Sequence, residues 1–176
     1  CIRDSTGAVA VSATDVTLRT VGALSVSGTA TNNLTLTAGG DITQSAALNV
    51  TGTANLTSTG DITLNNAANS FTGAVTAAAD DVRLNTTGAL TAAITATGDA
   101  TLTSVGNLTV SGASQNLTTT VTGANSTTTL GATTVRGALD VNATGNVLQT
   151  GALAVTGISD ISATTGSIAL NNSGNS

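Results

Sequence analysis

The sequence predicts an all-β protein, a parallel β-helix that winds through about 20 residues per turn. Three observations support this prediction: short stretches of alternating apolar and small polar residues, a recurring spacing of about 20 residues, and a composition poor in helix formers. Alternation is typical of strands with one buried and one exposed face. A spacing kept over many strands is typical of a solenoid, in which each turn stacks on the turn before it.

The expected strands are about five residues long, and each is bounded by Gly, Asn or Asp. The motif Gly-Asp-Ile-Thr shows the spacing, because its Asp stands at 41 and again at 61. The strands are expected within residues 15–20, 23–28, 33–38, 41–46, 47–52, 61–66, 81–86, 107–112, 138–143, 152–157 and 167–172. Bends are expected where Gly, Asn and Asp cluster between these segments.

The spacing also predicts which side chains stack inside the coil. A first inward ladder should contain Ile42, Ile62, Val82 and Leu102, with Val141 and Ile161 continuing it one residue early. A second register should contain Leu90, Val110, Leu130 and Leu170, interrupted by Thr150. Twenty residues suffice for three short strands and three bends, so we expect a three-sided rod of roughly nine turns that forms a single shaft over residues 1–176.

Composition excludes several function classes. The charged residues are four Arg and nine Asp, and the net charge is −5, so no basic patch for a nucleic acid can be assembled. The chain has no His, and hence neither an imidazole base nor an imidazole metal ligand. Asp80 and Asp81 are adjacent, and two neighbouring strand residues point to opposite faces. We therefore do not expect an enzyme, although a carbohydrate-active β-helix enzyme remains the alternative.

Cys1 is the only cysteine, so no disulfide can form within the chain. A cysteine at this position could carry the lipid of a processed bacterial lipoprotein. No apolar run approaches the roughly 18 residues of a membrane helix, so we expect no membrane insertion. Any export signal would lie outside this sequence.

Two long stretches resemble a known family. Residues 40–90, "GDITQSAALNVTGTANLTSTGDITLNNAANSFTGAVTAAADDVRLNTTGAL", are similar to the repeats of filamentous-haemagglutinin-like exoproteins, very large bacterial surface proteins. Residues 127–157, "TTTLGATTVRGALDVNATGNVLQTGALAVTG", resemble the same repeat. The resemblance extends from about Val9 to Asn172.

The resemblance implies a right-handed parallel β-helix that is exported through the outer membrane by a two-partner or autotransporter route. It further implies a structural segment of a cell-surface adhesin or extracellular filament, with a role in adhesion, aggregation or biofilm matrix. The partners would be other copies joined end to end, neighbouring repeats, or a host or matrix surface that includes carbohydrate.

One row of carboxylates is a candidate metal site. Asp41, Asp61 and Asp81 share one phase, and Asp140 and Asp160 join them at the same point of their strands. A Ca²⁺ ion between turns would relieve the repulsion between stacked carboxylates. The alternative is that each Asp caps a bend and faces water, with no cofactor bound.

Asparagines in Asn-x-Ser/Thr sequences are candidate glycosylation sites, because related adhesins carry sugars at such positions. The candidates are Asn33, Asn49, Asn55, Asn107 and Asn116. In a chain this rich in Asn and Thr, chance also supplies many such sequences.

Overall fold

A computed structural model describes residues 8–176, and within them every strand pairs in parallel with its neighbours and no helix occurs. The first sheet, called sheet A, contains β1 (Ala8–Ala13), β3 (Leu24–Ala30), β5 (Ile42–Val50), β7 (Ile62–Leu64), β8 (Ser70–Phe71), β10 (Val82–Thr86), β12 (Ala100–Ser104), β14 (Leu117–Val121), β16 (Leu139–Ala143) and β19 (Ser159–Ala163). Sheet B contains β2 (Val16–Thr20), β4 (Leu34–Ala38), β6 (Ala54–Ser58), β9 (Val75–Ala79), β11 (Leu90–Ala96), β13 (Leu108–Ser114), β15 (Thr128–Val135), β17 (Val147–Gln149), β18 (Leu153–Val155) and β20 (Ile168–Ala169).

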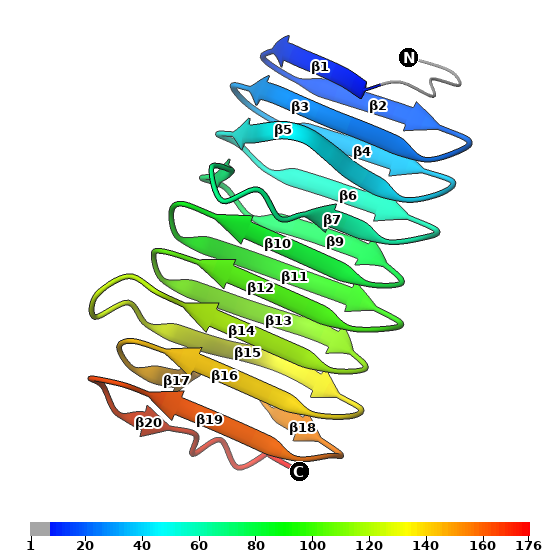
Figure 1. Cartoon of the computed structure of the whole chain (residues 1–176). Coiled ribbons are helices and arrows are strands. Elements are labelled where there is room, and N and C mark those ends of the chain that lie inside the picture. The colour runs from blue at the N-terminus through cyan, green and yellow to red at the C-terminus, as the bar shows by residue number, and fades with distance from the viewer. Residues whose placement is uncertain (1–7) are drawn as a thin grey trace.

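The chain winds into a β-solenoid of about eight turns, which confirms the predicted architecture (Figure 1). Sheet A strands run one way across the front, sheet B strands return behind them, and the coil advances from β1 to β20 with a right-handed sense (Figure 1). Successive turns take 18, 20, 20, 18, 17, 22 and 20 residues, as the column Leu24, Ile42, Ile62, Val82, Ala100, Leu117, Leu139, Ser159 shows. The expected nine turns become about eight, and Cys1 lies outside the described residues.

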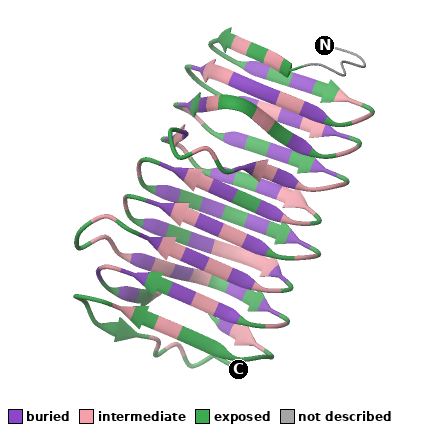
Figure 2. Cartoon of the chain, viewed as in Figure 1, coloured by how far each residue is buried: buried purple, intermediate pink, exposed green. Residues whose placement is uncertain are grey.

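The core is a narrow layer of aliphatic side chains between the two sheets. Alternate residues of each strand point inward, and the inward Ile42, Ile62 and Val82 are fully buried. These three residues also stack directly on one another, as their spacing predicts. Figure 2 shows the alternation along the strands in the middle of the coil as buried bands separated by intermediate or exposed bands.

The fourth member of the expected ladder is wrong. Val82 pairs with Ala100, and Leu102 stacks on Leu84 instead. The turn between Val82 and Ala100 is only 18 residues long, so the strand shifts by two positions, and a shift of two keeps the same side chains inward. Val141 and Ile161 do continue the column of Leu102, but this column starts at Leu64.

The second register is split in the same way. Val110 stacks on Leu130 as expected, but Leu90 pairs with Leu108. Thr150 is not part of the column, because its neighbour Gln149 is the residue that pairs with Leu130. Leu170 directly follows β20 and is partly buried against the core.

The strands group into two sheets, whereas the sequence predicts three sides. Long strands such as β5 and β13 replace two short strands with a bend between them, so the ladder shifts register and continues. Gly28 in β3 and Gly112 in β13 lie at these register shifts, with φ near 111° and 116°, a region that favours glycine. A Cβ at either position would also collide with the backbone of the preceding turn, at Val11 or Ile94. Most turns therefore contain two strands, whereas the turn with β7, β8 and β9 and the turn with β16, β17 and β18 contain three.

Across residues 8–176 the structure holds no helix that is long and apolar enough to cross a membrane.

Two threonines, Thr119 and Thr128, occupy fully buried inward positions, and within the described residues their hydroxyl groups have no hydrogen-bond partner. Both lie on the same turn, in β14 and β15. The core of this turn therefore contains two buried hydroxyl groups without hydrogen bonds.

Candidate functional site

The aspartate row lies at the corner where the chain enters sheet A. Asp41, Asp61 and Asp81 each stand directly before the first inward residue of a strand. The carbonyl of Asp61 accepts the N–H of Ile42 from the turn before, which continues the parallel ladder. The N–H of Asp61 points toward the turn before it. A side chain must supply its acceptor, because no backbone carbonyl of the ladder does so.

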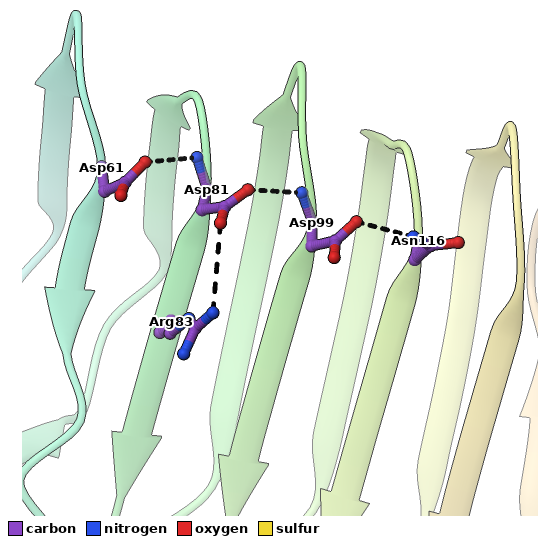
Figure 3. Close-up of polar contacts among 5 residues, drawn as sticks. All are labelled: Asp61, Asp81, Arg83, Asp99 and Asn116. Carbon is purple, nitrogen blue, oxygen red and sulfur yellow. Dashed lines mark hydrogen bonds and ion pairs between the residues drawn. The ribbon is translucent and has the colours of Figure 1, made fainter.

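Each aspartate supplies this acceptor to the next turn (Figure 3). Oδ1 of Asp41 accepts the N–H of Asp61 at 3.0 Å, and Oδ1 of Asp61 accepts the N–H of Asp81 at 3.1 Å. Oδ1 of Asp81 accepts the N–H of Asp99 at 2.7 Å, and Oδ1 of Asp99 then accepts from Nδ2 of Asn116 at 2.7 Å. The row is thus a chain of caps that link one turn to the next.

The opposite corner, where the chain enters sheet B, carries a second set of caps made mostly of asparagine. Oδ1 of Asn33 accepts the N–H of Thr53 at 3.0 Å. Oδ1 of Asn107 accepts the N–H of Thr127 at 2.8 Å, and Asn146 makes the same bond further along. A neutral side chain performs the same task here, so the role requires an oxygen acceptor and not a charge.

This geometry favours the capping interpretation over the Ca²⁺ hypothesis for Asp41, Asp61 and Asp81. The spacing correctly brings the three residues into one column, but Oδ1 of each accepts a backbone N–H. Within residues 8–176 no three side chains of the metal-binding types converge. The geometry therefore provides no argument for a bound metal.

Asp140 and Asp160 do not belong to this row, contrary to the expectation from their phase. They are the second residues of β16 and β19, and they stack on each other on the outer face of sheet A. Ala138 and Ile158 occupy the corner position in these two turns, where their carbonyls accept ladder hydrogen bonds. The reason is again a register shift, since Val141 follows the column of Leu102.

The adjacent Asp80 and Asp81 lie in the turn between β9 and β10, not in a strand. Oδ1 of Asp80 accepts the hydroxyl of Thr97 at 2.5 Å, while Oδ2 of Asp81 forms an exposed ion pair of 4.0 Å with Arg83 (Figure 3). Each carboxylate therefore has its own structural partner.

The candidate glycosylation sites divide into two kinds. Asn33, Asn107 and Asn116 use their side-chain oxygens as corner caps. Asn49 and Asn55 point outward from β5 and β6 and are exposed. A sugar attaches to Nδ2 and the caps use Oδ1, so these bonds exclude neither kind, and glycosylation of all five residues stays a prediction.

A buried polar cluster was not predicted from the sequence. Asn69 is fully buried, and its Oδ1 accepts the N–H of Leu48 and Nε2 of Gln44, both at 2.8 Å. Its Nδ2 donates to Oε1 of Gln44 and to the carbonyl of Leu64, both at 3.0 Å. Oε1 of Gln44 also accepts the N–H of Asn66 at 3.0 Å. We call this cluster the first clamp, because it replaces ladder bonds where β5 bulges.

A second clamp repeats these bonds near the other end of the chain. Oδ1 of Asn175 accepts the N–H of Leu153 at 3.0 Å and also Nε2 of Gln149. Its Nδ2 donates to Oε1 of Gln149 at 3.1 Å and to the carbonyl of Leu170 at 3.4 Å. Oε1 of Gln149 accepts the N–H of Asn172 at 3.2 Å. The signal in the sequence was the recurrence of Leu-Asn-Asn-x-x-Asn at 64 and 170.

The clamps show that the chain contains a duplication. Equivalent residues lie 149 − 44 = 105 and 175 − 69 = 106 positions apart. The first clamp forms on β5 in sheet A, whereas the second forms on β17 and β18 in sheet B. The path from β5 to β16 takes five turns and a further half turn leads to β17, so the two units are related by five and a half turns.

Comparisons with other proteins agree with this division. No curated protein and no solved structure matches the chain. A family described as repeats of unknown function, DUF5649, matches residues 13–78 and 114–176, which together make up more than half of the chain. Each matched segment contains one clamp. The chain therefore belongs to the DUF5649 family of repeats.

Proposed function

We propose that this chain is a structural segment of an exported bacterial adhesin or extracellular filament, in which it serves as a stiff shaft. The observation that carries the proposal is the pair of parallel ladders that connects every turn from β1 to β20. Each turn pairs its backbone groups with the turns on either side, which makes the shaft stiff. The corner caps and the two clamps add side-chain bonds between turns.

The outer faces suit exposure to solvent. Outward positions carry mostly Thr, Ser and Asn, as in β4 and β12, and few charges. Such a surface remains hydrated while it lacks the charge that would repel a neighbouring surface. The resemblance of residues 40–90 and 127–157 to filamentous-haemagglutinin-like repeats supports the same role, with a cell-surface location and a host or matrix partner.

Antibodies raised against the purified chain test this proposal. We expect them to label intact cells of the producing bacterium and to decorate surface fibres in immunogold electron microscopy. Labelling that requires permeabilised cells would contradict the proposed location. A strain in which residues 8–176 are deleted in frame is expected to aggregate less than its parent, and unchanged aggregation would argue against the structural role.

A further inference from the structure

The outer face of sheet A is a polar surface with charged residues at two separate places. Its outward residues form two columns across β10, β12, β14 and β16, which lie side by side on the front of the coil (Figure 1). One column contains Arg83, Thr101, Thr118 and Asp140, and the other contains Asn85, Thr103, Thr120 and Asn142. All eight residues are exposed or half-buried. The first column therefore starts with a cation, continues with two threonines and ends with an anion.

Charged side chains distinguish sheet A from sheet B. Among the described strands of sheet B, only β2 carries a charged residue, the exposed Arg19. The strands of sheet A contain Arg83, Asp140 and Asp160, and all three lie in the first column. A face without charges selects no orientation of a neighbouring molecule, whereas a face with separated charges of opposite sign does.

The anionic end of the column has no cation of its own. Asp140 and Asp160 stack directly on each other, and like charges in this position destabilise a sheet. Oδ1 of Asp140 accepts Nδ2 of Asn142 at 2.7 Å, but within residues 8–176 neither carboxylate forms an ion pair. A guanidinium group from another molecule would offset the repulsion between the two carboxylates.

The column is complementary to itself when it is reversed. Neighbouring strands lie about 4.8 Å apart, so Arg83 and Asp140 are about 14 Å apart, and the midpoint between them lies between β12 and β14. A two-fold axis through this midpoint, parallel to the strands, turns a second copy so that its sheet A faces the first. Arg83 then lies opposite Asp140 of the second copy, and Thr101 lies opposite Thr118. Each contact occurs twice, as in any two-fold interface.

We propose that two copies of this chain pair side by side through the outer faces of sheet A, with their long axes antiparallel. Two ion pairs between Arg83 and Asp140 hold the pair, and the threonines and asparagines of the columns meet between them. The Arg83 side chain is 57% exposed and lies 4.0 Å from Asp81, so its guanidinium can bind a second carboxylate. Strands of the two sheets run in the same direction, which is the arrangement of aligned sheet packing.

The corner where the chain enters sheet A follows the same symmetry. It carries Asp61, Asp81 and Asp99 on one side of the midpoint, and Asn116 and the exposed Arg136 on the other side. The axis therefore brings the corner at Asp81 to the corner near Arg136 of the second copy. Among the described residues of these columns and this corner, no two like charges lie opposite each other.

The size of the contact sets the strength that we expect. The strands β7, β10, β12, β14, β16 and β19 span about 29 Å along the coil, and a strand of five residues spans about 17 Å across it. Two such faces bury roughly 1,000 Å² in total, which is near the lower limit of a specific interface. We therefore expect pairing at high protein concentration that weakens as salt screens the ion pairs.

Reversal of the charges tests the contact. Arg83→Asp places a carboxylate opposite Asp140, and Asp140→Arg places a guanidinium group opposite Arg83, so each variant converts both ion pairs into like-charge contacts. Each should weaken the pair by more than about tenfold. The double variant Arg83→Asp/Asp140→Arg restores both ion pairs and should pair like the wild type. Arg19→Asp, the same substitution on the outer face of sheet B, is the matched control.

Sedimentation velocity on the full chain at low salt gives the readout. The wild-type chain and Arg19→Asp are expected to form particles of two times 16.8 kDa as the concentration is raised. Arg83→Asp and Asp140→Arg should each remain single copies with wild-type circular dichroism. An equal mixture of these two variants should form dimers again, because two carboxylates of one copy then face two guanidinium groups of the other.

Four results would overturn the inference: a wild-type chain that stays a single copy up to its solubility limit, charge-reversed variants that pair like the wild type, an equal loss in Arg19→Asp, or a mixture that does not pair. The inference goes beyond the proposed structural role and does not depend on it. A single copy in solution with surface labelling on cells would remove the pair and keep the shaft, and paired copies without surface labelling would do the reverse.

Discussion

Residues 54–64 and residues 159–170 follow one pattern, but only the first are covered by a following turn. Ile62 is 0% exposed and its equivalent, Ile168, is 48% exposed. The clamps beside the two segments make the same hydrogen bonds. The difference in burial therefore comes from the next turn and not from the segment itself. The inward side chains of a turn are therefore buried only when the neighbouring turn packs on them.

The largest expected effect is a charge in a covered turn. Ile62→Asp places an unpaired carboxylate in the aliphatic layer, and we expect it to lower the free energy of unfolding by about 4 kcal/mol. Ile168→Asp in a single copy should cost less than about 1 kcal/mol, because solvent reaches this side chain. The outward Thr63→Asp should also stay within about 1 kcal/mol of the wild type. Denaturant unfolding measures all three, and equal losses would show that the inward faces are wrongly assigned.

The clamps allow a second comparison at matched chemistry. Asn69→Ala removes four hydrogen bonds and leaves buried donors and acceptors unpaired, so we expect a loss of about 3 kcal/mol. Asn175→Ala removes equivalent bonds in an exposed position, where water replaces them, and should cost about 1 kcal/mol. Thermal unfolding of the two variants gives the comparison. A larger loss for Asn175→Ala would contradict the view that burial by the next turn sets the difference.

The corner caps should have a smaller effect. Asp61→Ala leaves the N–H of Asp81 without its acceptor and should cost about 1 kcal/mol. Asp61→Asn keeps an acceptor oxygen and should recover most of this loss, as the natural Asn33 and Asn107 caps do. Chemical denaturation distinguishes the two. If both variants lose the same stability, the charge of Asp61 matters and the capping interpretation is incomplete.

The smallest expected change is a gain. Thr119→Val removes a buried hydroxyl that has no partner within the described residues and keeps the shape of the side chain. We expect a stabilisation of up to about 1 kcal/mol. Thr118→Val, one residue earlier and only half-buried, is the control and should be close to neutral. A loss of stability in Thr119→Val would indicate that its hydroxyl is bonded after all.

The sequence predicts the parallel solenoid, the inward direction of its apolar residues and the stack of Ile42, Ile62 and Val82, because alternation and spacing report these features directly. It places Leu102 on Val82, whereas Leu102 stacks on Leu84. The turn between them is two residues shorter, and a shift of two residues keeps the same side chains inward, so the alternation does not reveal it. It also assigns Asp140 and Asp160 to the corner, although they lie on the outer face of their strands. Such shifts depend on how many residues each bend absorbs, and spacing alone does not report that number.

The clamps were missed for a different reason. Gln44 and Asn69 are 25 residues apart and belong to different turns, so no local pattern connects them. Asn69 also stands in a stretch of Asn, Ala and Ser that resembles an ordinary exposed loop. Comparison of the chain with itself at a shift of 105 or 106 residues reveals both clamps together. The repeat of about 105 residues therefore identifies the clamps, and a search for the 20-residue spacing alone does not find it.

Hydrogen–deuterium exchange of residues 54–64 and 159–170 tests most directly whether each turn completes the core of its neighbour. At a dilution where the chain is a single copy, amides of residues 54–64 should exchange slowly, because turns cover them on both sides. Amides of residues 159–170 should exchange much faster despite the equivalent sequence and clamp. Equal protection of the two segments in single copies, or faster exchange in residues 54–64, would contradict the account.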